Sequence, residues 1–437
     1  MSAAIRGARF GRAHRPSWQA LARWVGLGTL VFIAPVAAAQ NPPALDIDVA
    51  MDLAEAHSQA LPAQQWAAMA ARERAVAAGQ IPDPTLRWSL DNVPIEGSAQ
   101  RLLTREPMTA RSVGISQAWP DEAKRRARSQ RHEQDALLAW ARRDARRAEL
   151  RRETALAWLA VRAELQRTAL LAAMQTEAAL TVQAAEAAYR AGRGSQVDVF
   201  TARALPVRLD DQRLQVDTAL ANARSALRRW IGAAADRPLG KALPLRADPV
   251  SDPDGARLLA ADPELGAAIA RENSARAMAD LAREERRADW STDLRFQHRG
   301  SRFDNMVSIG VSLPLRWDPA NRQQRELAAR LAETAQVEAE TEELRRARRA
   351  EVERWQQRWR AGLDRLAAYD QLQLPLAASR IESSLSAYRA GNGPLLAVLA
   401  ARQAELALRM ERVQIELDSA SDEARLSTLI PPPEATR

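Results

Sequence analysis

Cysteine is absent from the 437-residue chain. Disulfides and a lipid-modified N-terminal cysteine are therefore excluded, and we expect an exported form to be held together by packing and assembly alone. Long apolar runs are also missing, because no stretch beyond the first 40 residues approaches the 18 uninterrupted apolar residues of a membrane-spanning helix. If the chain meets a membrane, we expect strands to make the contact.

Residues typical of enzyme sites are scarce. Beyond residue 39 the histidines are His57, His132 and His298, which stand far apart and lack the spacing of metal ligands. Neither a G-x-S-x-G motif nor a glycine-rich phosphate loop occurs. Most carboxylates stand three or four residues from arginines, as on solvated helix faces. The sequence therefore predicts no enzyme activity, no metal site and no cofactor.

The N-terminal segment has the pattern of an export signal. Five arginines and no acidic residue accompany an apolar run from Trp24 to Val36, and Ala37-Ala38-Ala39 offers an A-x-A cleavage site. We expect residues 1–39 to be a Sec signal peptide, with an uncleaved anchor as the alternative. Its removal leaves 58 of the 63 Lys and Arg against 55 Asp and Glu, so the net charge falls from +8 to +3. A nucleic-acid partner is not expected.

The most informative pattern present is an internal repeat. The sequence YRAGRG that begins at Tyr189 returns as YRAGNG at Tyr388, an offset of 199 residues. This period is far longer than that of a solenoid and predicts one unit duplicated in tandem. We expect the first unit at 40–232, a proline-rich connector at 233–255, the second unit at 256–430 and a tail at 431–437.

Each unit has the pattern of long helices interrupted by two strands. Period-two alternation predicts strands at about 84–91 and 111–119 and again at about 292–299 and 305–317. The helical patterns cover 49–79, 121–190, 196–231, 256–288, 320–390 and the residues after 393, with Pro206 and Pro375 as expected kinks. Glycine turns at 191–195 and 390–394 would join helices into hairpins.

The predicted strands suit a membrane. Each is close to the 9–11 residues that a tilted strand needs to cross a bilayer. Four tryptophans lie in or beside them, as an interfacial aromatic belt requires: Trp88, Trp119, Trp290 and Trp317. Charged residues on the opposite side are candidates for a water-filled lumen: Arg87, Asp91, Asp293, Arg295 and Arg316. Four strands cannot close a barrel, so we expect eight strands from two chains or twelve from three. A β-layer capping a helical bundle in water is the alternative.

Taken together, these residues resemble the TolC-type outer-membrane channels of tripartite efflux and type I secretion systems. The resemblance rests on the duplicated helix–strand–strand–helix plan, the two Tyr-Arg-Ala-Gly turns and Pro82-Asp83-Pro84 before the first strand. Short stretches resemble the heavy-metal branch (cobalt–zinc–cadmium or copper–silver): Pro82 to Pro94, Val113 to Gln117, Lys124-Arg125-Arg126, Leu313-Pro314-Leu315 and Asn321-Arg322.

The resemblance implies a mainly α fold with a small β part. Duplicated long-helix hairpins would form a periplasmic α-barrel. Four transmembrane β-strands per chain would contribute to a 12-stranded β-barrel in a homotrimer, placed in the outer membrane of a Gram-negative bacterium. The implied function is a passive exit duct for heavy-metal ions, without catalysis or cofactor. The same channel for drugs, organic solutes or secreted protein is one alternative, and a soluble periplasmic coiled-coil scaffold or adaptor is another.

The resemblance also implies partners besides outer-membrane lipid. A periplasmic adaptor (membrane fusion) protein would contact the hairpin tips, and an inner-membrane pump, of RND type, would load the cargo. Carried onto this sequence, the adaptor contacts are Gly192, Arg193, Gly194, Ser195, Gly391, Asn392 and Gly393. The second tip departs from members that narrow the entrance with a ring of aspartates, because it has no carboxylate. Near the first tip Asp198 is a candidate for such a ring, with a side chain that simply faces water as the alternative.

Overall fold

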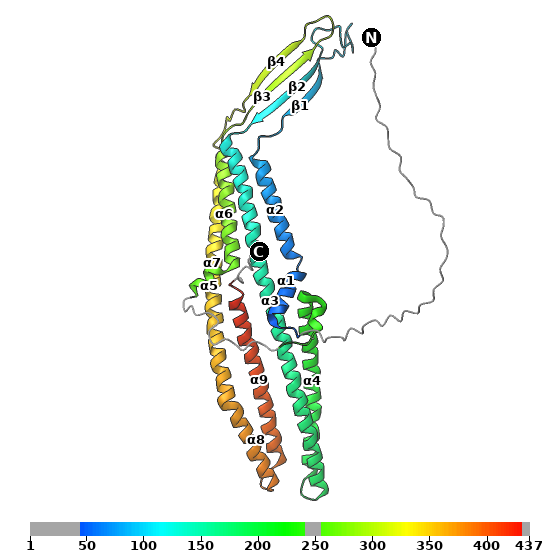
Figure 1. Ribbon diagram of the computed structural model, residues 1–437, viewed down its shortest axis with the longest axis vertical. Coiled ribbons are helices and arrows are strands. Elements are labelled where there is room, and N and C mark those ends of the chain that lie inside the picture. Colours follow the sequence, from blue (N-terminus) through cyan, green and yellow to red (C-terminus); the bar gives the residue numbers. More distant parts are fainter. Residues whose placement is uncertain (1–43, 241–254, 431–437) are drawn as a thin grey trace, which may run out of the picture. The chain divides into compact units, whose positions relative to one another are not determined.

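The computed structural model describes residues 44–240 and 255–430. The predicted signal peptide, residues 241–254 of the predicted connector and the predicted tail lie outside the described residues. The long helices run side by side, with the strands at one end and the helix–helix turns at the other (Figure 1). Within the described residues, none of the helices combines the length and apolar character needed to cross a membrane.

The first half of the chain contains two strands between helices. Its elements are α1 (Ile47–His57), α2 (Ala60–Gly79), β1 (Thr85–Asp91), β2 (Ala110–Trp119), α3 (Glu122–Arg190), α4 (Gln196–Ile231) and a 3-10 turn, Gly232–Asp236. The second half follows the same order. Its elements are α5 (Ala256–Ala261), α6 (Pro263–Glu284), β3 (Trp290–His298), β4 (Met306–Ser312), α7 (Gln323–Ala368), a π-helical turn at Tyr369–Gln373, α8 (Leu374–Arg389) and α9 (Leu395–Ser427).

Several element boundaries differ from those predicted. The predicted helix at 49–79 is divided after His57, and the one at 256–288 is divided at Asp262, whose carboxylate caps α6 by accepting from the Glu264 N–H at 2.9 Å. The predicted strand at 305–317 ends at Ser312, because Pro314 has no N–H to donate to a ladder. α4 continues through Pro206 without a break, whereas Pro375 is the second residue of α8, which begins directly after the π-helical turn.

The strands form one antiparallel sheet in the order β1-β2-β3-β4. The central pairing of β2 with β3 joins the two halves of the chain, from Arg111 opposite His298 to Trp119 opposite Trp290. Among the described strands, β1 pairs only with β2 and β4 pairs only with β3. The sheet therefore has two open edges.

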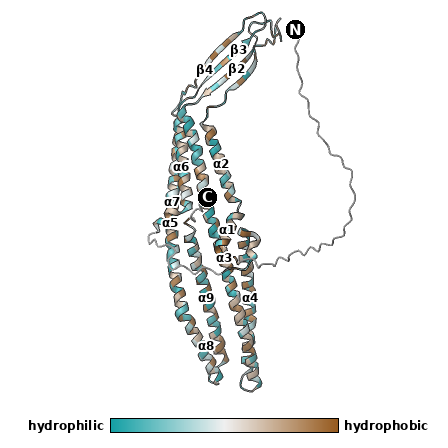
Figure 2. Cartoon of the chain, in the orientation of Figure 1, coloured by the Kyte–Doolittle hydropathy of each residue, from teal (hydrophilic) through white to brown (hydrophobic). Residues whose placement is uncertain are grey.

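The two largest of four apolar clusters within the described residues join the helices of both halves. One surrounds Trp158 of α3, which is fully buried and donates its indole N–H to the Leu45 carbonyl at 2.9 Å. The other lies nearer the helix turns, where Leu171 of α3 and Leu205 of α4 pack with Leu395 of α9. Elsewhere hydrophilic and hydrophobic residues are interspersed along the helices (Figure 2). The second half of the chain is thus packed directly on the first.

Candidate functional site

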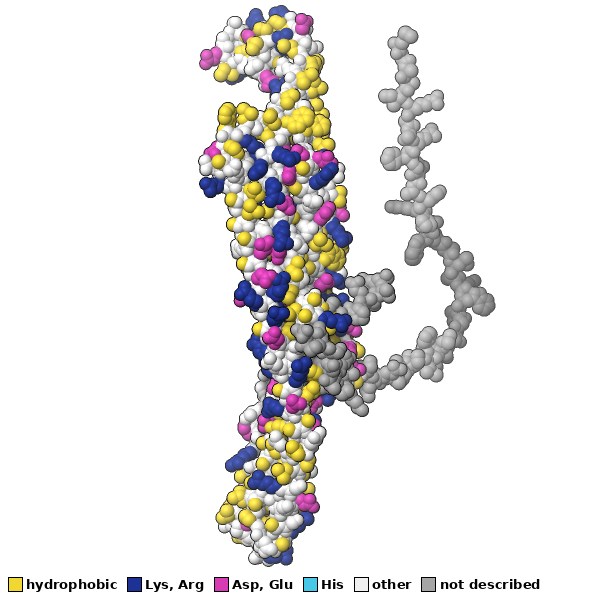
Figure 3. Space-filling model, turned by 90° about the vertical axis from the view of Figure 1, so that its left-hand side faces the viewer, with side chains coloured by type: hydrophobic (Ala, Val, Ile, Leu, Met, Phe, Trp, Pro, Cys, Tyr) yellow, Lys and Arg dark blue, Asp and Glu magenta, His cyan; other side chains and the backbone are white. Residues whose placement is uncertain are grey.

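The central part of one face of the sheet consists of exposed apolar side chains. The strand register aligns them in two rows: Leu86, Ile115, Leu294 and Ile309, and then Trp88, Val113, Phe296 and Val307. These eight side chains are between 46% and 79% exposed. Figure 3 shows hydrophobic side chains gathered toward the strand end, while charged side chains are spread over the helices. Such a contiguous apolar surface indicates an apolar environment or a partner.

The other face of the sheet is polar. Its rows are Thr85, Ser116, Asp293 and Gly310, then Arg87, Gly114, Arg295 and Ser308, and then Ser89, Ser112, Gln297 and Met306. The Ser89 and Ser112 hydroxyls lie 2.9 Å apart, and both donate to the Asp91 carboxylate. Four of the five predicted lumen residues, Arg87, Asp91, Asp293 and Arg295, therefore share this face.

The two helix turns at the opposite end have the same backbone geometry. Gly192 and Gly391 adopt φ values of +69° and +76°, a conformation that glycine reaches without strain. The following residues, Arg193 and Asn392, each donate their N–H to an alanine carbonyl of the preceding helix at 2.9 Å. The sequence repeat thus corresponds to two equivalent hairpin tips.

The two tips differ in how the next helix begins. Ser195 and Asp198 form a reciprocal capping box: the Ser195 hydroxyl accepts from the Asp198 N–H, and the Asp198 carboxylate accepts from the Ser195 N–H at 3.0 Å. At the second tip Pro394 precedes α9 and offers no side-chain cap. The Asp198 carboxylate therefore caps its own helix.

Exposed apolar residues follow both tips. Val197 is 72% exposed, Phe200 59% and Leu396 61%. The predicted tip residues are also on the surface, with Gly194 and Gly393 partly covered. The signal that could have identified Val197 and Leu396 is their place in the first helical turn after each glycine turn. Exposed apolar side chains beside accessible backbone make the tips candidates for a protein contact.

Solved structures share this arrangement over nearly all of the chain. CusC, described as forming a transmembrane channel, matches with a TM-score of 0.73 and 16% identity over 88% of this chain and 92% of its own. The outer-membrane channel OprN matches with a TM-score of 0.75 and 16% identity, over 88% of this chain and 89% of its own. The outer-membrane protein VceC from Vibrio cholerae matches with a TM-score of 0.73 and 18% identity, over 88% of this chain and 95% of its own. The chain has the TolC-type channel fold. No protein-family model matches the sequence, and no curated protein does either.

The TolC-type fold confirms the fold class expected from the sequence: mainly helical, with duplicated long-helix hairpins and a small four-stranded part. The aromatic candidates fall into two groups within it. Trp119 and Trp290 stack with ring centroids 5.7 Å apart at the helix-proximal end of the sheet, and Trp317 follows β4 at the same end. Trp88 instead lies in the middle of β1, opposite Val113.

Arg316 lies apart from the other predicted lumen residues. It follows β4, and its guanidinium donates to the carbonyls of Glu285 and Arg287 at 2.8 and 2.7 Å. It therefore satisfies carbonyls at the end of α6, which is a structural task at the helix–strand junction of this TolC-type fold. Sequence alternation placed it with the lumen residues because it could not reveal that β4 ends before Pro314.

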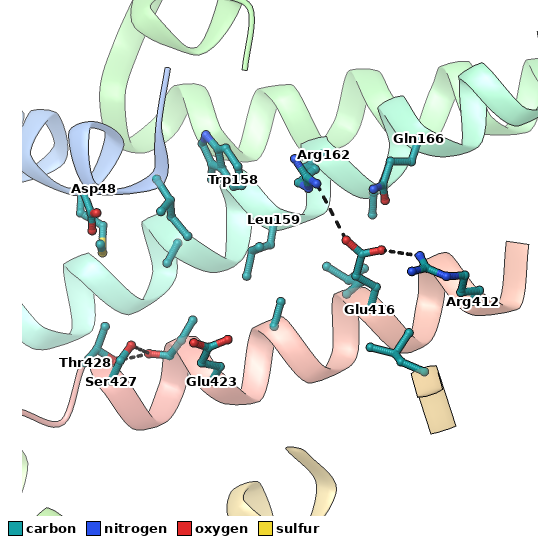
Figure 4. A pocket seen from close by; sticks show the side chains of 18 of the residues that line it. Asp48, Trp158, Leu159, Arg162, Gln166, Arg412, Glu416, Glu423, Ser427 and Thr428 are labelled. Atoms are coloured by element: carbon teal, nitrogen blue, oxygen red, sulfur yellow. Dashed lines mark hydrogen bonds and ion pairs between the residues drawn. The ribbon is translucent and has the colours of Figure 1, made fainter. Parts of the chain in front are cut away.

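A cavity of about 430 Å³ lies among α1, α3, α7 and α9 of the TolC-type fold (Figure 4). At its charged end Arg412 bonds to Asp370 at 2.6 Å and to Glu416 at 2.8 Å. The hydrogen bonds from Arg412 hold the pKa of Asp370 below its ordinary value, and those to Asp370 raise the pKa of Arg412. Ion pairing thus accounts for these charges, and no group of three metal-ligating side chains occurs within the described residues.

Proposed function

We propose that this chain is the outer-membrane channel of a tripartite efflux system in a Gram-negative bacterium, acting as a passive exit duct. The observation that carries the proposal is the sheet, with its exposed apolar face, its polar opposite face and two open edges at one end of the long helices. The likeness to solved outer-membrane channels supports the same reading. No bond is broken in this function, and no catalytic residue is required.

Closure of the sheet requires further copies of the chain. In lipid, each unpaired backbone N–H or C=O costs several kcal/mol, so the open edges of β1 and β4 must be paired. Pairing β1 of one copy with β4 of the next in a homotrimer gives twelve strands from the four of each chain. The apolar rows then face lipid and the polar rows face a water-filled lumen.

The tips would contact the periplasmic adaptor, which connects the channel to an inner-membrane pump of RND type. We propose that the adaptor contacts residues 192–195 at the first tip and residues 391–393 at the second, together with the exposed Val197 and Leu396. Residues 1–39 would direct export. The cargo proposed is heavy-metal ions, supported by the short stretches that resemble the heavy-metal branch.

Fractionation and mass measurement test the channel directly. The full chain is expressed with its leader in a Gram-negative host, and the expected product is a detergent-requiring assembly of about three chains in the outer-membrane fraction, with ion conductance in a planar bilayer. A protein that leaves the periplasm without detergent as a monomer or dimer, and that conducts no ions, would show that the scaffold alternative is correct.

Site-specific cross-linking tests the tips. Because the chain has no cysteine, single substitutions Ser195→Cys and Asn392→Cys each carry one photoactivatable thiol reagent, with Ser98→Cys in the exposed β1–β2 loop as the matched control. Light should attach a periplasmic protein of constant mass to both tip variants and not to the control. Equal labelling at Ser98→Cys, or none at the tips, would contradict the proposed contact. Growth of a host lacking the gene, on copper, zinc or cadmium and on organic toxicants, distinguishes the cargo classes.

A further inference from the structure

Two arginines on the polar face of the sheet have no counter-charge in contact within the described part of the chain. Arg87 of β1 and Arg295 of β3 both lie in register with Gly114 of β2. Neighbouring strands are about 4.8 Å apart, so the two arginine Cα atoms are separated by roughly 10 Å. Among the described residues, neither guanidinium has a hydrogen bond or an ion pair. Both charges are therefore available to solutes on this face.

Gly114 leaves the space between the two arginines open. A β carbon at this position would lie 3.2 Å from the Leu294 carbonyl oxygen, which is tighter than ordinary packing, and 3.5 Å from the Arg295 β carbon, which is an ordinary contact. A side chain here would therefore press on the neighbouring strand and occupy the space between the two arginines. With glycine, both long side chains can extend over the strand that separates them.

The carboxylates on the same face are held close to the strands. Asp91 accepts hydrogen bonds from the Ser89 and Ser112 hydroxyls. The carboxylate of Asp293 lies over Gly310, where a β carbon would overlap it. Arginine extends its charge several ångströms further from the backbone than aspartate does, so the guanidinium groups reach further into the solvent above the sheet.

Screening decides which of these charges act together. At about 3.3 Å per residue, Asp91 is roughly 13 Å along the strand from the level of Arg87, which exceeds the Debye length of about 8–10 Å at physiological salt. Asp293 is only two residues from Arg295 and lies within that length. At the level of Gly114 each chain therefore presents two positive charges against one negative charge.

We propose that Arg87 and Arg295 form an arginine belt that makes the transmembrane lumen favour anions over cations. The inference rests on the proposed function, because three copies of the chain close the ring and place six guanidinium groups at one level. A ring of like charge selects the opposite ion by lowering its free energy at that level. Metal cargo accordingly passes this level more readily as an anionic complex than as a bare cation.

The zero-current potential under a KCl gradient tests the belt. The purified full-length channel is placed in a planar bilayer at about 0.1 M salt, where screening still permits selectivity. The wild type should show a chloride-to-potassium permeability ratio above one. The Arg87→Gln, Arg295→Gln double variant should lower that ratio to one or below, and Asp293→Asn should keep or raise it. Raising the salt to about 1 M should move the wild-type ratio toward one, because the Debye length falls to about 3 Å.

The outcomes separate the belt from the channel itself. Wild-type preference for potassium would overturn the belt, and so would a double variant with wild-type conductance and an unchanged ratio, which would place selectivity elsewhere in the duct. Complete absence of conductance in the wild type would refute the channel function and the belt with it. The unboiled gel checks that each variant retains the assembly of the wild type, and loss of assembly in the double variant would refute the solvent-facing position given to these arginines.

Discussion

The sharpest energetic prediction concerns the ion pair that joins α6 to α7. Arg348 donates through Nε to Asp262 at 2.7 Å, with their side chains only 8% and 1% exposed, and also bonds Glu351 at 2.7 Å. Burial disfavours the charged guanidinium, but the hydrogen bond to Asp262 and the neighbouring carboxylates outweigh that effect and raise the pKa of Arg348. The guanidinium therefore stays charged, and both side chains of the pair are almost fully buried.

Replacing Arg348 with Met should strongly destabilise the protein. Among the described residues, the buried carboxylate of Asp262 would keep only the Glu264 N–H at 2.9 Å as a partner. Breaking a buried pair from one side costs about 3–5 kcal/mol of the free energy of unfolding. Asp262→Asn in the same chain should recover part of this loss, because asparagine still caps α6 and no charge is left buried. The coupling between the two substitutions is thus expected to be favourable.

Guanidinium unfolding followed by helical circular dichroism, at fixed protein and detergent concentration, measures these differences. Arg346→Met is the matched control, since Arg346 and its partner Glu343 are both 73% exposed and such a pair contributes about 0–1 kcal/mol. The reasoning fails if Arg348→Met behaves like Arg346→Met. It also fails if the double variant with Asp262→Asn is at least as unstable as Arg348→Met alone.

Three further predictions concern other regions. Lys124→Met should lower the free energy of unfolding by about 3 kcal/mol and speed amide hydrogen exchange at residues 286–290. The reason is that the buried Lys124 ammonium donates to the Arg287 carbonyl at 2.8 Å and to the Asp289 carboxylate at 2.5 Å. Unchanged exchange would contradict this prediction. Asp370→Asn should flatten the acid side of the curve of unfolding free energy against pH. The folded pKa of Asp370 lies below its unfolded value, so its contribution to stability is present above about pH 4 and is lost as the pH falls through the folded pKa. Melting scans between about pH 6 and 3 should show the melting temperatures of wild type and variant converging. Ser195→Ala removes one half of the capping box and should weaken the start of α4 by about 1 kcal/mol, seen as faster proteolysis at 191–199 with no change at 390–395; equal acceleration at both tips would refute a local effect.

Much of the fold could be predicted because its signals are local. Period-two alternation located the strands, and an unbroken helical pattern with an aspartate before it and glycines after it located α3. The two turns were evident from the repeated sequence, because each places a glycine where the backbone needs a positive φ. The boundaries that were predicted wrongly lie where a helix start interrupts a continuous helical pattern. At Asp262, a capping carboxylate and the following proline begin a new helix inside such a pattern.

The candidate residues were predicted less completely, because their roles depend on residues far away in the chain. Arg87 and Arg295 are separated by more than two hundred positions, and only the strand register places both beside Gly114. Arg316 resembled them in sequence and lies instead on the carbonyls at the end of α6. The exposed Val197 and Leu396 were not singled out, although each stands in the first helical turn after a glycine turn.

The sequence by itself determined the duplication, the element types and the two-faced character of each strand, because these depend on composition and on spacings of a few residues. The tertiary structure decided which strands are neighbours, which face each charge occupies, that α9 of the second half packs on α3 of the first, and that the sheet ends in two open edges. Those features arise from contacts between residues remote in sequence, whose pairing no local period encodes.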